Sequence, residues 1–146
     1  MLPMIWRKQM PDFGMTFHHM GLAVRQEDQA INFLEGMDYR IGDKIYDPEQ
    51  NVHLRLCTAL DKPAFELIMQ GIGDGPLDTI LKHTSEIIYH TCYETDCLDK
   101  TLSALEAKDL RVFPIVPPKP ALLFGNRKVS FYQVMGFGFI ELLESA

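Results

Sequence analysis

The first half of the chain shows apolar and polar positions in the order strand, helix and three strands. The strand-forming run 17–24 precedes segment 25–39, in which Ala30, Phe33 and Leu34 form an apolar helical face at offsets of three and four. Three strand-like runs follow, separated by the turn sequences DPEQ and LDKP: residues 40–47, 51–60 and 64–70. The pattern predicts a βαβββ module over about residues 12–72.

The same order returns in the second half, after a linker at 73–85. A strand is predicted at 87–96 and a helix at 97–110. Three further strands are predicted at 111–116, 127–134 and 136–144, with the proline-rich segment 117–126 as a loop. Repeated halves in a small protein indicate duplication with pseudo-twofold packing. We therefore expect one α+β domain over residues 1–146, with its second βαβββ module at about 86–146.

Two histidines and two glutamates occupy matching places in these modules. His19 and His90 begin the opening strands, 71 residues apart, and Glu66 and Glu141 lie in the closing strands, 75 residues apart. Both glutamates stand within apolar runs, AFELIM and GFIELLE. An ionised side chain is costly there unless it is paired or binds a metal.

Strand alternation places these side chains on faces that carry small residues. His19 shares its face with Gly21 and Ala23. The larger apolar neighbours of Glu66 then face the helix: Phe65, Leu67 and Met69. We expect the two histidines and two carboxylates to line a concavity. Such a set suits zinc, cobalt, nickel or manganese, and leaves a six-coordinate ion two open positions for substrate oxygens.

Each of these residues taken singly has a structural explanation. His90 fits a hydrogen-bonded core histidine, and Glu66 fits an ion pair with Arg55. The matched placement in both modules favours a metal. The opening strand of the second module has a single histidine, so aligning the two strands selects His19 as the donor. His18 is then expected on the opposite face or at the rim, where its replacement leaves metal binding intact.

Composition narrows the range of partners. The formal charge of −6 over 146 residues disfavours nucleic acid or an anionic membrane as partner. We find no 18-residue apolar run and no secretory signal, and therefore expect a cytoplasmic protein without a membrane span. The three cysteines lack paired metal spacing, which indicates reduced thiols: Cys57, Cys92 and Cys97. A small molecule is the expected partner.

Four segments resemble the vicinal-oxygen-chelate superfamily, which includes glyoxalase I, ring-cleaving dioxygenases and methylmalonyl-CoA epimerases. They are HHMGLAV, AFELIMQ, IIYHTCYETD and FGFIELLE, and the resemblance covers about residues 16–144. It implies two βαβββ modules that form a U-shaped β cup around one metal ion, and a homodimer. The implied metal ligands are His19, Glu66, His90 and Glu141.

Two further segments are similar to the methylmalonyl-CoA epimerases: PEQNV at 48–52 and GDGPLDTILK at 73–82. The similarity implies a divalent-metal-dependent epimerase that removes a proton next to the carbonyl of an acyl-CoA thioester. Glu49 and Glu141 would then be the two catalytic bases, one on each face of the carbon. Asn51 stands where these enzymes usually have glycine, and asparagine tolerates the positive φ of such a turn.

The loops leave the substrate open. Segment 116–128 is more apolar and richer in proline than the matching epimerase loop, so another acyl thioester or a natural-product intermediate also fits. The same four donors serve a glyoxalase-I-type lyase that acts on a glutathione hemithioacetal. A small-molecule-binding resistance protein is the non-enzymatic alternative. Three basic residues fit either contacts with CoA phosphates or a solvated face: Lys119, Arg127 and Lys128.

Overall fold

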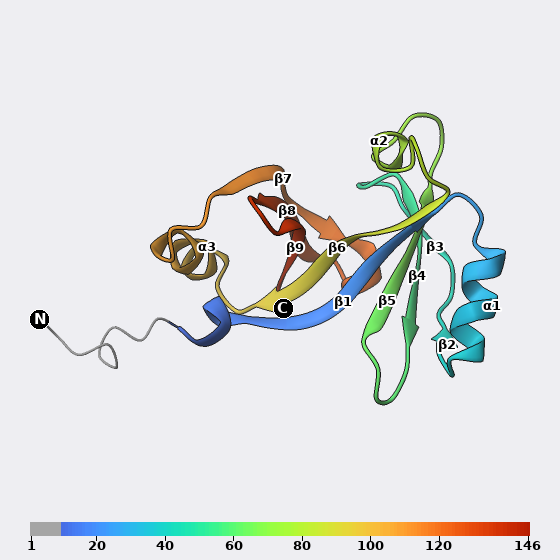
Figure 1. Ribbon diagram of the computed structural model, residues 1–146, viewed down its shortest axis with the longest axis horizontal. Coiled ribbons are helices and arrows are strands. Elements are labelled where there is room, and N and C mark those ends of the chain that lie inside the picture. Colours follow the sequence, from blue (N-terminus) through green and yellow to red (C-terminus); the bar gives the residue numbers. More distant parts are fainter. Residues whose placement is uncertain (1–9) are drawn as a thin grey trace, which may run out of the picture.

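The computed structural model describes residues 10–146, and its chain runs through a βαβββ unit twice (Figure 1). The first unit contains β1 (Met15–Val24), α1 (Asp28–Gly36), β2 (Arg40–Ile41), β3 (Ile45–Asp47), β4 (Val52–Thr58) and β5 (Ala64–Gln70). The second contains β6 (Glu86–Thr95), α3 (Leu98–Ala107), β7 (Val112–Ala121), β8 (Arg127–Val134) and β9 (Gly138–Glu144). Three short helices lie outside this repeat: η2 (Pro11–Gly14), α2 (Leu77–Ile80) and η3 (Leu122–Phe124).

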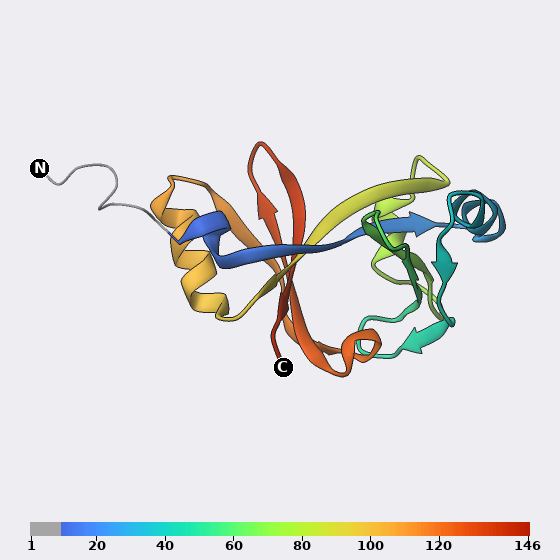
Figure 2. The ribbon, with the colours of Figure 1, turned by 90° about the horizontal axis from the view of Figure 1, so that it is seen from below.

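All strands belong to one 9-stranded sheet, in which β3 pairs with β4 beside the main order β2-β4-β5-β1-β6-β9-β8-β7. The opening strands β1 and β6 are antiparallel neighbours at its centre, as Figure 1 shows, and each pairs in parallel with the closing strand of its own unit. Figure 2 shows the end of β7 and η3 reaching across to β3. This arrangement confirms the predicted α+β fold of two pseudo-symmetric units.

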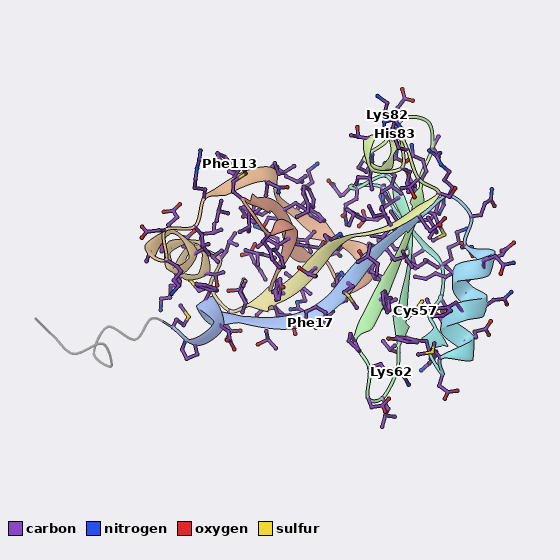
Figure 3. The ribbon with its side chains drawn as sticks, in the orientation of Figure 1. Phe17, Cys57, Lys62, Lys82, His83 and Phe113 are labelled. Atoms are coloured by element: carbon purple, nitrogen blue, oxygen red, sulfur yellow. The ribbon has the colours of Figure 1, made fainter. Side chains whose placement is uncertain are left out.

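The core of the first unit lies between the sheet and α1. Leu34 of α1 packs with Leu67 and Met69 of β5, and Cys57 lies in the same cluster beneath the helix (Figure 3). Strand alternation predicted this facing correctly for β5. The prediction for the helix was wrong at Phe33, which is 69% exposed, because Ala30 and Ile31 complete the buried face with Leu34.

Three element boundaries differ from the sequence prediction. The expected strand at 40–47 is divided into β2 and β3, and the linker contains α2, which is anchored by buried Leu77. The segment 117–126, expected as a loop, lies largely within β7, which continues to Ala121. Prolines are accommodated there because β7 is the edge strand of the sheet and its pairing with β8 has register shifts after Pro114 and Val116.

Candidate metal centre

Four donor side chains meet on the four central strands of the sheet. His19 lies on β1, Glu66 on β5, His90 on β6 and Glu141 on β9, and the four are adjacent in the strand order. Their exposed fractions are 0%, 4%, 3% and 2%, respectively. Each offers one ligand atom, and these atoms all lie within 4.8 Å of one another. The structure thus brings together all four residues that the sequence predicts as metal ligands.

The spacing of the donor atoms fits a single ion. Nε2 of His19 lies 3.2 Å from Oε1 of Glu141 and 3.6 Å from Oε1 of Glu66. Nε2 of His90 lies 3.2 Å and 3.8 Å from the same two oxygens. Ligands about 2.1 Å from one metal lie roughly 3.0–3.4 Å apart in octahedral or tetrahedral geometry, so a small inward movement of Glu66 completes the set.

The hydrogen bonding of the buried donors also points to a metal. Nε2 of His19, Nε2 of His90 and Oε1 of Glu141 are buried without a hydrogen-bond partner. Unsatisfied polar atoms in a protein interior cost free energy, and three of them converging on one point indicate a missing cation. With two neutral imidazoles and two carboxylates, a divalent ion makes the centre electrically neutral.

Protons occupy the same centre when no metal is present. Burial alone lowers the pKa of His19, but the hydrogen bonds to Glu141 and Glu66 outweigh it and raise this pKa to about 9. Burial raises the pKa of Glu141, while its contacts with His19 and His90 lower it to about 2. The metal-free centre therefore contains a protonated His19 beside an ionised Glu141, and a metal ion must displace that proton.

Gly21 makes room for the ring of His90. The two residues are paired across β1 and β6, and a Cβ added at Gly21 would lie 2.1 Å from Cε1 of His90. The pseudo-twofold position of Gly21 in the second unit is Cys92, which pairs with His19 in the same way. Any side chain at Gly21 would displace the donor.

His18 lies against the donor His19. The pairing of β1 with β6 shifts register between Phe17 and His19, and this irregularity places Nδ1 of His18 2.8 Å from Nδ1 of His19. Because Nε2 of His19 needs its lone pair for a metal, its Nδ1 carries the proton and donates to His18. The expectation that His18 faces away from the donors and is dispensable is therefore wrong: a regular strand alternates, and a bulge does not.

A cavity of about 580 Å³ reaches the centre at Glu66. One side is formed by aliphatic residues of the first unit: Val52, Leu54, Ile68 and Ile80. The other is formed by aromatic residues of the second unit: Tyr89, Phe131 and Phe139. Tyr89 and Phe131 also pack edge-on against His90, with ring centroids 4.5 Å and 5.3 Å from it. Burial, together with the charges of Glu66 and Glu141, raises the pKa of Tyr89 well above its usual value, so its hydroxyl stays protonated.

The turn between β3 and β4 holds Glu49, which is exposed and lines the same cavity as Glu66. Buried Asp47 accepts hydrogen bonds from the backbone nitrogens of Glu49 (2.9 Å) and Gln50 (3.3 Å), and from the backbone nitrogen of Leu122 in the second unit (3.2 Å). The turn is thereby fixed to both units. The sequence pattern did not single out Asp47, although Asp-Pro before a turn is a recognisable signal.

Asn51 closes this turn with a φ of 53°, as its residue type allows. Its side-chain oxygen accepts hydrogen bonds from the Tyr46 hydroxyl (2.7 Å) and from the backbone nitrogen of Ile72 (3.0 Å). A Cβ at Gly71 would lie 2.2 Å from this oxygen, so the close approach of the two segments requires glycine there. Both ends of the turn that carries Glu49 are thus held by side chains.

The three basic residues considered as phosphate contacts are in different surroundings. Lys119 is half-buried and lines the cavity. Arg127 is paired with Glu94 at 2.6 Å and donates through Nε to the backbone oxygen of Glu144. Lys128 is exposed, and neither it nor Arg127 lines the cavity. Only Lys119 is placed to meet a ligand there.

Residues outside the centre agree with their sequence interpretation. The three cysteines have free thiols. His83 lies in the loop after α2, at the periphery of the molecule in Figure 3. Among residues 10–146, no helix has the length and apolar character needed to cross a membrane.

Comparison with known proteins adds a family and a fold. Residues 18–131 match the family model of the glyoxalase/bleomycin resistance protein/dioxygenase superfamily. The structure is similar to that of methylmalonyl-CoA epimerase from Mycobacterium tuberculosis, with a TM-score of 0.71 and 17% identity over 97% of this chain and 95% of that chain. No curated protein matches the sequence significantly.

Two other solved structures have the same fold. A Streptomyces coelicolor methylmalonyl-CoA epimerase variant in complex with 2-nitronate-propionyl-CoA has a TM-score of 0.68 and 18% identity, over 89% of this chain and 96% of that chain. A hypothetical protein from Bacillus halodurans C-125 has a TM-score of 0.71 and 15% identity, over 90% of this chain and 95% of that chain. At these identities the likeness concerns the fold alone.

Proposed function

The chain belongs to the glyoxalase/bleomycin resistance protein/dioxygenase superfamily, and we propose that it is a divalent-metal-dependent isomerase that abstracts a proton next to a carbonyl, in the manner of an epimerase. One observation carries the proposal: the donor Glu66 and the exposed carboxylate of Glu49 line one cavity. A base at the mouth and a Lewis acid at the end of the cavity are the two requirements of this reaction.

The proposed centre holds one ion of cobalt, zinc, manganese or nickel through His19, Glu66, His90 and Glu141. Mixed imidazole and carboxylate ligands suit these borderline ions. When bound, the ion stabilises negative charge that develops on the carbonyl oxygen of the substrate.

The proton is moved by the carboxylates of this chain. Glu49 is exposed and takes the proton from the carbon on one face, while its turn is held in place by Asp47. Glu141, buried among the donors, supplies a proton on the other face. Inversion needs one such group on each side of the carbon, and each well-placed general base or acid contributes about 10²–10⁴-fold in rate.

An acyl-CoA thioester is the proposed substrate. Its thioester carbonyl acidifies the neighbouring C–H bond, and Lys119 at the cavity is placed to contact an anionic part of such a molecule. The resemblance to known epimerases also predicts a homodimer in the cytoplasm, and both remain predictions. Sedimentation of the purified protein measures the first.

Solvent deuterium exchange tests the proposal. The metal-loaded protein is incubated in D₂O with methylmalonyl-CoA and with α-branched alkyl and aryl acyl-CoA thioesters, and label at the α-carbon is measured. We expect Glu49→Gln to lose about 10²–10⁴-fold in exchange rate while keeping its metal. Glu35→Gln, at an exposed site on α1, is the matched control and should behave as the wild type. Unchanged exchange in Glu49→Gln would exclude this residue as the base.

The glyoxalase-I-type reaction gives a different pattern in the same variants. It uses the same four donors but does not need Glu49. Turnover of a glutathione hemithioacetal that survives Glu49→Gln, without exchange into any thioester, would favour that lyase over the proposed isomerase.

A further inference from the structure

The cavity beside the metal centre is lined mainly by apolar side chains from both units. From this lining we infer that the substrate of the site carries an uncharged, apolar acyl substituent, alkyl or aryl, rather than a small anionic one such as a malonyl carboxylate. The inference rests on the proposed function and adds the substrate class to it.

The two sides of the cavity are of different character. Val52 and Leu54 of β4 and Ile68 of β5 provide an aliphatic surface, and these residues belong to one buried cluster with Leu77 of α2. Phe131 and Phe139 provide an aromatic surface, with ring centroids 5.4 Å apart. An alkyl or aryl group between the two surfaces would contact carbon on both sides.

Ile115 shows that part of this lining lacks a protein partner. It lies on the edge strand β7, lines the cavity and is 51% exposed. Covering exposed apolar surface is favourable by roughly 25 cal/mol per Å². A methyl group is about the size of a water molecule, roughly 30 Å³ in the liquid, so it would fill only a small fraction of a cavity of about 580 Å³.

The charges at the cavity disfavour an anionic substituent. Glu49 and Glu66 are both acidic, and Lys119 is the one cationic side chain in the lining. The two donor carboxylates already neutralise a divalent ion, so the centre has no excess positive charge for a further carboxylate. An anion against the apolar surface would lose hydration without an opposite charge to replace it.

Binding of small chelators tests the inference without requiring catalysis. Hydroxamates present two neighbouring oxygens to a metal, and the cobalt-loaded protein is titrated with acetohydroxamate, hexanohydroxamate, 3-phenylpropanohydroxamate and the monohydroxamate of succinic acid. Each methylene group that leaves water improves affinity by up to about fourfold, so we expect hexanohydroxamate to bind at least about tenfold more tightly than acetohydroxamate. The phenyl compound should share this gain, and the succinic compound should show none.

Two isoleucine variants form a matched pair. Ile115→Lys places a cation in the cavity lining and should reduce the advantage of the hexanoyl chain while improving binding of the succinic compound. Ile72→Lys, at a 77% exposed position that does not line the cavity, should leave the series unchanged. Equal affinities along the series, tightest binding of the succinic compound, or no binding of any hydroxamate to the loaded protein would overturn the inference.

The two proposals fail separately. Flat hydroxamate affinities with intact deuterium exchange would remove the apolar substituent and leave the isomerase. A chain-length dependence with no exchange into any thioester would remove the isomerase and leave an apolar ligand at the metal centre.

Discussion

The two donor histidines occupy equivalent places in the two units, yet their surroundings differ. His19 is enclosed: His18 meets its Nδ1, and Phe124 stacks on its ring with centroids 5.5 Å apart. His90 has no hydrogen-bond partner at Nδ1, and its neighbours Tyr89 and Phe131 line the cavity. The donors thus follow the pseudo-twofold symmetry, whereas their neighbours do not.

The difference shows how a duplicated fold acquires one active side. Metal binding needs the symmetric part, since each unit supplies one imidazole and one carboxylate. Substrate binding needs the asymmetric part. At the residue before the donor, the first unit has His18, which supports a ligand, and the second has Tyr89, which faces the cavity. Variants of paired positions therefore separate metal binding from substrate binding.

The largest effect is expected from the donors themselves. His19→Ala and His90→Ala should each leave less than about a tenth of an equivalent of metal after reconstitution and desalting, because an incomplete ligand set binds weakly. His83→Ala removes an exposed histidine in the loop after α2 and should retain the wild-type content. Elemental analysis measures all three. Retention of metal by either donor variant would show that the two units do not contribute equally.

Gly21→Ala should come next, because the added Cβ would lie 2.1 Å from Cε1 of His90. We expect at least about tenfold weaker metal binding and a loss of roughly 1–3 kcal/mol in unfolding free energy. Gly36→Ala is the control: it lies on α1 with nothing within 4 Å of the added Cβ, and should stabilise by about 0.5–1 kcal/mol. Chelator competition and thermal melting distinguish them, and equal behaviour of the two variants would contradict the close packing at Gly21.

His18→Ala should weaken metal binding by about 10–100-fold, the usual effect of removing a hydrogen-bond partner of a ligand. His18→Asn, whose amide oxygen can accept the same proton, should recover part of the loss. Tyr89→Phe, at the equivalent position, should leave metal affinity unchanged because Nδ1 of His90 has no partner to lose. If His18→Ala binds metal as tightly as the wild type, the two histidines have no such difference in support.

The smallest effect is a pH dependence of the metal-free protein. The pKa of His19 is raised from 6.5 to about 9, so its contribution to stability is full below pH 6.5 and is lost as the pH rises through 9. The pKa of Glu141 is lowered from 4.5 to about 2, so its contribution is full above pH 4.5 and is lost as the pH falls through 2. The melting temperature in chelator should be highest between about pH 4.5 and 6.5.

Metal should remove the alkaline part of this dependence, because the ion takes the place of the proton on His19. Calorimetric melts with and without cobalt compare the two states. A metal-free protein that is equally stable at pH 6 and pH 9 would contradict the ion pair of His19 and Glu141.

The donor set could be predicted from the sequence because it repeats. Glu66 and Glu141 stand out as charges within apolar runs, and their spacing matches that of the two histidines. The strand order followed from the same repeat. Neither conclusion required a long-range contact to be known in advance.

Features that depend on local irregularity or on the other unit could not be predicted. The bulge that turns His18 toward His19 leaves no mark in the alternation of β1. The proline-rich part of β7 has the composition of a loop, and only its place at the sheet edge makes it a strand. The bond between Asp47 and Leu122 joins residues 75 positions apart in sequence.

Anomalous X-ray scattering from crystals of the cobalt-reconstituted protein tests the central claim most directly. The account predicts one strong peak, bonded to Nε2 of His19, Nε2 of His90 and one carboxylate oxygen each of Glu66 and Glu141, and open toward the cavity at Glu66. No peak among these four side chains, or a peak bound by the residues of one unit only, would contradict it.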